Sequence, residues 1–339
     1  MEFREGRNPA KKPSRNQQTA ARRMKNDPPG CFLLSGRVFG IMQGLSHFHC
    51  RVLGIFLEGR VSMLFQDISI DVQPRAAALT DASPVLCFQP GQVLLGSKEG
   101  APRLPLYREV EPLLPPDMEW TALLTVDGQA IFTPDPLREG TVPEGNGLHY
   151  GPVRLFRDMD SRSAAAVTAA HHLWQWMRRN RFCGGCGGKT AHDKAERALR
   201  CPVCGQVNYP MIAPAIIVAL TCGDSILLAK NAASPWKHYG LVAGYVEVGE
   251  TLEQAVRREV MEEVGLPVRD LRYIGSQPWG VSGSLMCAFQ GETYSSLPLK
   301  IQRSELADAK WVSRDQLSAP ERTVSVALEM IERFRQGRL

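Results

Sequence analysis

The sequence has no long apolar run and no excess of charge over most of its length. The longest apolar stretch, residues 212–220, spans nine residues and includes a proline, whereas a helix that crosses a bilayer needs about 20. The first 30 residues hold eight Lys/Arg and three Asp/Glu, which leaves 32 of each sign in the remaining 309. We therefore expect no membrane span and no global basic surface for nucleic acid.

Residues 1–30 also lack the apolar core of a secretory signal. The segment is polar and carries a surplus of basic residues, so we expect a disordered basic tail, with weak contact to nucleic acid as the alternative. A transit peptide is disfavoured by its three acidic residues. With no secretion signal, the expected location is cytoplasmic, where thiols stay reduced.

Four of the nine cysteines fall into two close pairs. The pairs Cys183–Cys186 and Cys201–Cys204 form a C-x2-C-x14-C-x2-C pattern. Four sulfurs arranged tetrahedrally suit zinc, and a site filled by sulfur has no open position for a substrate. The pattern predicts one structural Zn²⁺ per chain, in preference to disulfides or redox pairs, which a reducing cytoplasm disfavours.

Turn residues and composition divide the rest of the chain. Residues 31–160 hold short β-rich runs between Gly and Pro turns, which predicts a degenerate β-rich domain with antiparallel hairpins. The alanine-rich stretch 163–180, with Ser161 or Ser163 as N-cap, predicts a helix that leads into the cysteine pairs. His171 and His172 on that helix are expected to be ordinary helix residues near an interface. The expected units are a tail at 1–30, a β-rich domain at 31–160, a helix and zinc ribbon at 161–208, and a C-terminal domain at 209–339.

Residues 244–266 carry the most specific pattern in the chain. They fit G-x5-E-x7-R-E-U-x-E-E-x-G-U at every fixed position, where U is a bulky aliphatic residue. Thr251 with Gln254 is typical of a capping box and Gly265 suits a helix C-terminus, so a helix is predicted from about 252 to 264. A buried stripe recurs every four residues on it: Leu252, Val256, Val260 and Val264.

Three carboxylates crowd one face of this predicted helix. Glu259, Glu262 and Glu263 stand at i, i+3 and i+4, a spacing at which like charges repel. A divalent cation removes that repulsion, and carboxylate oxygens suit Mg²⁺ or Mn²⁺, which also bridge to phosphate oxygens. A solvated acidic face is the alternative. The pattern predicts a metal beside a diphosphate and a water activated for attack on phosphorus, with Glu250 and Arg258 paired to tie the preceding loop to the helix.

Residues 244–266 therefore resemble the signature box of the Nudix hydrolases, which cleave nucleoside diphosphates linked to another moiety on an α/β/α sandwich. The resemblance implies a structural pair of Glu250 and Arg258 and more than one Mg²⁺ or Mn²⁺ ion per site. It implies that the catalytic acids are Glu259, Glu262 and Glu263. The implied metal ligands are Ala243, through its carbonyl, and Glu259, Glu263 and Glu305.

The stretch SQPWGVSGSLM, residues 276–286, is similar to the mark of the NADH pyrophosphatase branch of that family. The mark reads S-Q-P-W-P-F-P-x-S and then L-M, and this chain keeps its ends but has Gly280, Val281 and Ser282 at its centre. A zinc ribbon before the Nudix domain belongs to the same branch. The resemblance implies that the substrate contacts Glu196, Tyr209, Ser325 and the loop residues Gln277, Pro278, Trp279, Gly280, Val281, Ser282, Gly283 and Ser284.

The branch implies hydrolysis of the pyrophosphate of NAD(H) to AMP and NMN(H), removal of NAD caps from RNA, and a homodimer. Because Val281 replaces an aromatic residue, and a lost base stack costs about 1–3 kcal/mol, we expect weaker or broader base selection. Two alternatives stay open: a Nudix hydrolase retuned to ADP-ribose or another nucleoside diphosphate derivative, and a catalytically silent nucleotide sensor.

Overall fold

The computed structural model describes residues 67–72, 77–115, 117–233, 238–294, 297–320 and 325–339. The expected tail at 1–30 and the first part of the expected β-rich domain lie outside these ranges. Within them, no helix has both the length and the apolar character that a membrane span requires.

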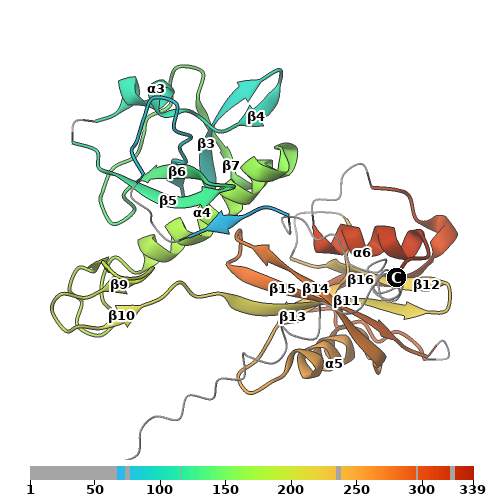
Figure 1. The fold of residues 1–339 in the computed structure, drawn as a ribbon. Helices are drawn as coiled ribbons and strands as arrows, with labels where there is room; N and C mark the ends of the chain where they lie inside the picture. The colour runs from blue at the N-terminus through green and yellow to red at the C-terminus, as the bar shows by residue number, and fades with distance from the viewer. Residues whose placement is uncertain (1–66, 73–76, 116, 234–237, 295–296, 321–324) are drawn as a thin grey trace, which may run out of the picture. The chain divides into compact units, whose positions relative to one another are not determined.

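Short antiparallel strands dominate the region up to residue 152 (Figure 1). One sheet has the order β1-β5-β6 and consists of Ile70–Asp71, Trp120–Val126 and Gln129–Pro134. The other joins β2 (Phe88–Gln89), β3 (Gln92–Lys98), β4 (Ala101–Arg103) and β7 (His149–Pro152). The turn between β5 and β6 is Asp127-Gly128, whose φ angles of 47° and 84° match the positive values that a tight hairpin turn needs. Short helical turns lie between β4 and β5, at α3 (Tyr107–Val110) and η1 (Glu111–Leu113), and after β7, at η2 (Val153–Asp158).

Helix α4 (Ser161–Arg179) begins two residues earlier than the alanine pattern predicted. Its N-cap is Asp160, so the expectation of Ser161 or Ser163 was wrong. The Asp160 carboxylate accepts hydrogen bonds from the backbone N–H groups of Arg162 and Ser163 at 3.0 Å each, and a carboxylate also favours the positive end of the helix dipole. The alanine-rich face of α4 is buried against β5 and η2.

After α4 the chain forms a small three-stranded sheet of order β10-β9-β8, made of Val207–Asn208, Leu199–Arg200 and Ala191–His192. The two cysteine pairs lie beside these strands, in the turns at 183–188 and 201–206. Gly187 and Gly205 follow the second cysteine of each pair with φ of 74° and 79°. Their N–H groups donate to the carbonyls of Cys183 and Cys201 at 2.9 Å, which closes each turn.

The C-terminal domain is a mixed sheet with one helix on each face (Figure 1). The strand order is β14-β15-β11-β12-β16, with β13 also paired to β11. The strand bounds are β11 Ala213–Cys222, β12 Ser225–Asn231, β13 Val242–Tyr245, β14 Arg269–Trp279, β15 Ser284–Glu292 and β16 Leu306–Ser313. The helices are α5 (Leu252–Val264) and α6 (Val326–Arg335), with η3 (Arg314–Gln316) between β16 and α6.

Strand β11 explains why both faces of this sheet are covered. Its residues alternate between two cores, as the period of two in a strand requires. Ile216 packs with the valines of α5, whereas Ile217 packs with Met330 and Phe334 of α6. The predicted α/β/α sandwich is therefore confirmed.

Helix α5 also matches its prediction at both ends. The Thr251 hydroxyl accepts from the N–H of Gln254 at 3.2 Å, and the Gln254 side chain accepts from the N–H of Thr251 at 2.8 Å. Gly265 ends the helix in the left-handed region, with φ of 71°. Three of the four stripe residues, Val256, Val260 and Val264, are fully buried.

Candidate functional site

Glu259 and Glu263 turn inward from α5, whereas Glu262 faces solvent. The first two residues are 8% and 5% exposed, and the Glu262 side chain is 52% exposed. The Glu259 carboxylate lies against the backbone of β13, because a Cβ built on Gly244 would meet its Oε1 at 2.1 Å. Gly244 is therefore required for this approach, and it places Glu259 next to Ala243, the residue whose carbonyl was expected to bind metal.

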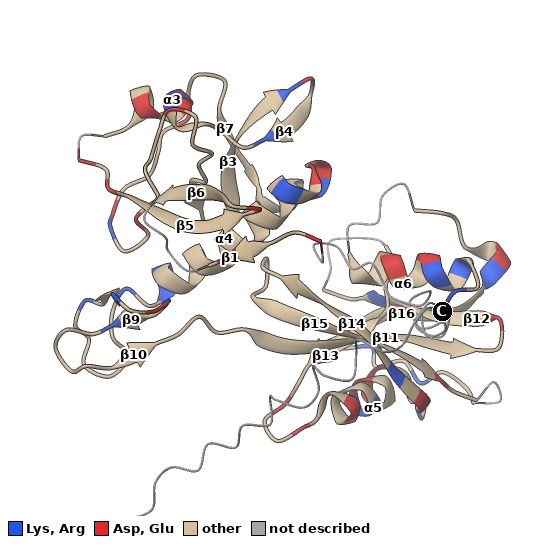
Figure 2. Cartoon of the chain, in the orientation of Figure 1, with Lys and Arg blue, Asp and Glu red and all other residues tan. Residues whose placement is uncertain are grey.

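Arg258 links the loop, the strand and the helix around these acids. Its guanidinium donates to both carboxylate oxygens of Glu250, at 2.6 and 2.9 Å, and to the Tyr245 carbonyl at 2.9 Å. The remaining Nη1 donates to Glu259 at 2.8 Å and to Glu262 at 3.2 Å. Arg258 thus relieves part of the repulsion among the acids, and α5 carries both signs of charge (Figure 2).

Glu263 is the acid whose negative charge is least compensated by neighbouring groups. Burial is the largest cause that raises its pKa, and together with the neighbouring charges of Glu259, Glu305 and Glu262 it raises that pKa to about 7. Burial also raises the pKa of Glu259 despite its bond to Arg258. Among the described residues, Oε2 of Glu263 is buried with no hydrogen-bond partner. A hard divalent cation fits this position, because it supplies the positive charge and the missing contact together.

Glu305 approaches the same acids from the loop before β16. Gln302 donates its backbone N–H to the Glu263 carbonyl at 2.9 Å, and its side-chain amide donates to Glu305 at 3.3 Å. The loop is therefore fastened to the end of α5. This explains how Glu305, 42 residues beyond Glu263, comes close enough to affect the pKa of Glu263.

The four paired cysteines converge on one point. Their sulfurs all lie within 4.8 Å of one another, with Sγ–Sγ separations of 3.6 Å for Cys183 and Cys204 and 3.5 Å for Cys186 and Cys201. A tetrahedral site with Zn–S bonds of about 2.3 Å needs sulfurs roughly 3.8 Å apart. Several hydrogen bonds, of which that from the N–H of Cys204 contributes most, lower the pKa of the Cys201 thiol to about 7, which favours the thiolate that binds metal. This donor set fits zinc.

The segment 276–286, which we call the SQPW loop, comprises the end of β14, a turn and the start of β15. Its two ends make hydrogen bonds that stabilise the fold. The Gln277 side chain is fully buried, and its Oε1 accepts from the N–H of Val326 at the start of α6 at 2.7 Å. Ser284 is buried and donates to the Tyr245 hydroxyl at 3.2 Å, and it also bonds to Ser282 at 2.8 Å. A line of hydroxyl groups therefore runs from the loop to the strand that precedes the acidic helix.

The centre of the loop packs partly inward. Trp279 meets Phe156 edge to face, with ring centroids 5.6 Å apart, and Arg157 lies 5.7 Å from its ring centroid. Val281 packs against the same core. The Gly280 carbonyl lies 3.4 Å from Nδ1 of the buried His171. The hydrophobic effect thus directs these side chains toward α4 and the β-rich region.

A cavity of 340 Å³ beside the loop brings together residues predicted from distant parts of the chain. Tyr209, Ser282 and Gly283 line it, and the Tyr209 hydroxyl donates to Glu196 at 2.7 Å. Pro278 and Gly280 line a second cavity, of 630 Å³, which also includes Tyr209. Both cavities share His172 of α4, which we had interpreted as an ordinary helix residue. No local motif marks it, because only the fold brings α4 to the loop.

Ser325 directly precedes Val326, the residue whose N–H binds the Gln277 side chain. It is the N-cap of α6, and its hydroxyl accepts from the N–H of Leu328 at 3.4 Å. The serine therefore caps a helix in this structure. An alanine at this position would lack that hydrogen bond.

Comparison with known proteins agrees with this arrangement. Residues 211–334 match the family described as NUDIX domain, and residues 178–209 match the NADH pyrophosphatase zinc ribbon domain. The two matches follow each other directly along the chain. A solved NUDIX hydrolase from Nitrosomonas europaea aligns at 20% identity and a TM-score of 0.40, over 46% of this chain and 91% of that one.

The sequence matches to curated relatives extend across both domains. The NAD-capped RNA hydrolase NudC of Pseudomonas aeruginosa is 40% identical over 189 residues, which are 56% of this chain and 68% of the relative. The protein of the same name from Salmonella agona is 44% identical over 182 residues, 54% of this chain and 70% of the relative. The acidic helix, the cysteine cluster and these matches together show that the chain belongs to the Nudix hydrolases, in the branch that carries the NADH pyrophosphatase zinc ribbon.

Proposed function

We propose that this protein hydrolyses the pyrophosphate bond of NAD(H) to AMP and NMN(H), and that the same site removes NAD caps from RNA. The observation that carries the proposal is the pair of inward-facing carboxylates, Glu259 and Glu263, on the helix of a complete Nudix box. The names of the relatives support the substrate, because both are NAD-capped RNA hydrolases.

The acids of α5 have distinct proposed roles that follow from their exposure. Glu259, Glu263 and Glu305, with the Ala243 carbonyl, would hold more than one Mg²⁺ or Mn²⁺ ion, which would polarise phosphorus–oxygen bonds and acidify a bound water. We propose that Glu262, whose side chain is half exposed, accepts the proton of the attacking water. The water oxygen bonds to one phosphorus, and the bridging oxygen leaves with the other nucleotide.

Substrate recognition is proposed for the cavities beside Tyr209. The Tyr209 ring is half exposed and provides a face for a base, while Glu196 orients its hydroxyl. Ser282 and Gly283 add polar groups from the loop. We further propose a structural zinc in the cysteine cluster, a homodimer and a cytoplasmic location.

The test replaces Glu263 by glutamine, which keeps the size of the side chain and removes its charge. We expect AMP release from NADH in Mg²⁺ or Mn²⁺ to fall by at least about 100-fold, with an unchanged circular dichroism spectrum. The matched control is Glu253→Gln, because Glu253 lies exposed in the first turn of the same helix and outside the acidic face. Equal activity in both variants would refute the assignment.

A second candidate substrate, ADP-ribose, is favoured by the altered loop centre. Val281 stands where the branch has an aromatic residue, and the Trp279 ring is engaged with Phe156 and Arg157. Turnover of NADH, NAD⁺, ADP-ribose and diadenosine polyphosphates, measured side by side, separates the candidates. A clear preference for a substrate without nicotinamide would overturn the NAD(H) proposal, and the absence of any product would favour a silent sensor.

A further inference from the structure

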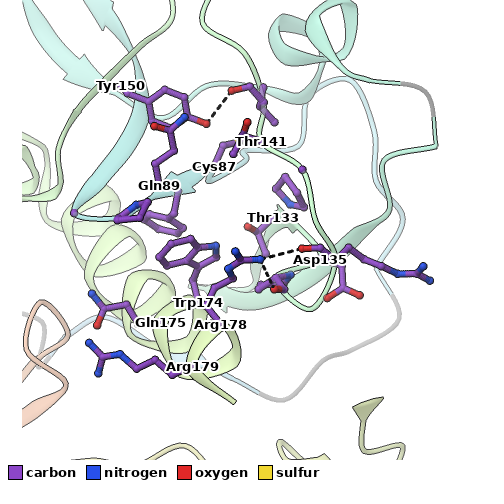
Figure 3. Close-up of a pocket in the computed structure, with 18 residues that line it drawn as sticks. Cys87, Gln89, Thr133, Asp135, Thr141, Tyr150, Trp174, Gln175, Arg178 and Arg179 are labelled. Carbon is purple, nitrogen blue, oxygen red and sulfur yellow. Dashed lines mark hydrogen bonds between the residues drawn. The ribbon is translucent and has the colours of Figure 1, made fainter. Parts of the chain in front are cut away.

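A cavity of 330 Å³ lies outside the acidic helix and the SQPW loop, between the β-rich region and α4 (Figure 3). Its walls come from β2, the end of β6, the segment 135–142 and the last turns of α4. None of the residues proposed for hydrolysis lines it. It touches the cavity beside Tyr209 only through Gln175 and Arg179, which line both and point away from Thr133 in Figure 3.

Thr133 lines this cavity, and its buried hydroxyl lacks a hydrogen-bond partner among the described residues. The residue is 1% exposed. A buried hydroxyl without a partner costs about 1–3 kcal/mol, so such groups are rare unless a ligand or water satisfies them. Thr133 lies at the end of β6, and its side chain is among those gathered around the cavity.

Arg178 places a cation in the same cavity. Its Nη1 donates to the carbonyls of Pro136 at 3.3 Å and Arg138 at 3.0 Å, which fixes the guanidinium against the segment 135–142. No carboxylate of a described residue lies within ion-pair distance of it, and its Nε and Nη2 have no hydrogen-bond partner in the described part of the chain. A planar guanidinium with two adjacent free donors matches the geometry of a phosphate.

Trp174 supplies a flat wall next to these two groups. The indole is partly exposed. The His171 ring stacks on it with a centroid separation of 6.3 Å, and the Phe88 ring lies at a centroid separation of 5.6 Å. Pro90, Pro134 and Pro136 form further apolar wall. A flat apolar wall with one polar contact at its edge and a cation nearby suits a heteroaromatic ring that carries an anionic group.

We propose that this cavity binds a nucleoside 5′-monophosphate unit, with its base against Trp174, the base edge bonded to the Thr133 hydroxyl and the phosphate on Arg178. The volume supports a single nucleotide, because 330 Å³ is at the lower end of the roughly 300–1,000 Å³ of small-molecule sites. The unit is either a free mononucleotide or one nucleotide of an RNA chain. The inference does not depend on the hydrolytic function.

The experiment is calorimetric titration of the full chain with AMP in EDTA, for the wild type and for two cavity variants. Thr133→Val keeps the shape of the side chain and removes its hydroxyl, and we expect AMP binding to weaken roughly 2- to 10-fold. Arg178→Gln removes the cation, and we expect a loss of at least about 10-fold. The control, which should bind AMP like the wild type, is Thr125→Val, in a strand threonine that does not line the cavity.

The outcomes are distinct. Unchanged AMP affinity in both Thr133→Val and Arg178→Gln, or no AMP binding by the wild type, overturns the inference even where NADH turnover is normal. Thr133→Val also guards against misfolding, because replacing an unpaired buried hydroxyl by a methyl group should not lower the unfolding temperature. A short RNA with a 5′-phosphate, titrated in parallel, distinguishes the sources: tighter binding than AMP with the same sensitivity to Arg178→Gln assigns the site to RNA.

Discussion

Gly280 gives the sharpest test of how the loop is held. A Cβ added at this position would lie 1.9 Å from the backbone oxygen of Thr168 and 2.6 Å from its carbonyl carbon. Both atoms belong to α4, so the contact cannot be relieved by rotating a side chain. Because ordinary contact begins at 3.4 Å, Gly280→Ala must separate the loop from α4 by about 1.5 Å.

The cost of that separation can be bounded from the packing. Overpacking a close contact costs about 1–3 kcal/mol, and the shift also loosens Trp279 and Val281, which are partly buried against the core beside α4. We expect a loss of about 2 kcal/mol or more in the free energy of unfolding. For domains of 150–250 residues, that corresponds to a drop of about 4–8 °C in the unfolding temperature.

Thermal and urea unfolding of Gly280→Ala measure this effect. The control is Gly240→Ala, because a Cβ at Gly240 would meet no atom within 4 Å and its φ is not positive. The KM for NADH should also rise in Gly280→Ala, since Ser282 moves with the loop. If the two alanine variants unfold at the same temperature, the close approach of the loop to α4 is not a real constraint and the reasoning fails.

Three further predictions concern other parts of the molecule. Cys204→Ser should lower the bound zinc measured by atomic absorption and lower the unfolding temperature, because binding energy in such sites is folding energy; full zinc content would contradict it. Gly244→Ala should reduce turnover in a folded protein, because the new methyl group displaces the carboxylate of Glu259; wild-type kinetics would contradict it. Arg103 lowers the pKa of Glu109 through a hydrogen bond, so this pair stabilises the fold above the unfolded pKa of about 4.3 and the effect is lost as pH falls through the lower folded value. The difference in unfolding free energy between wild type and Arg103→Gln should stay constant from pH 6 to 8 and shrink below pH 4; a pH-independent difference would contradict it.

The sequence by itself determined the features whose chemistry is local. Helix α5 was predicted with its capping residues and its C-terminal glycine, because capping and stripe periodicity depend on neighbours within a few turns. The convergence of the four cysteines was predicted in the same way, since each C-x2-C pair closes its own turn. The N-cap of α4 was missed, although Asp160 was visible in the sequence, because serine and aspartate are both good caps and only the backbone path separates them.

The tertiary structure decided what distant segments do to one another. The Trp279 ring, for example, is partly buried against Phe156 and the core beside α4. Likewise, Thr133, Trp174 and Arg178 line one cavity although Thr133 lies more than 40 positions from the other two. Such contacts depend on how buried apolar surfaces pack together, and no short pattern in a single sequence encodes that arrangement.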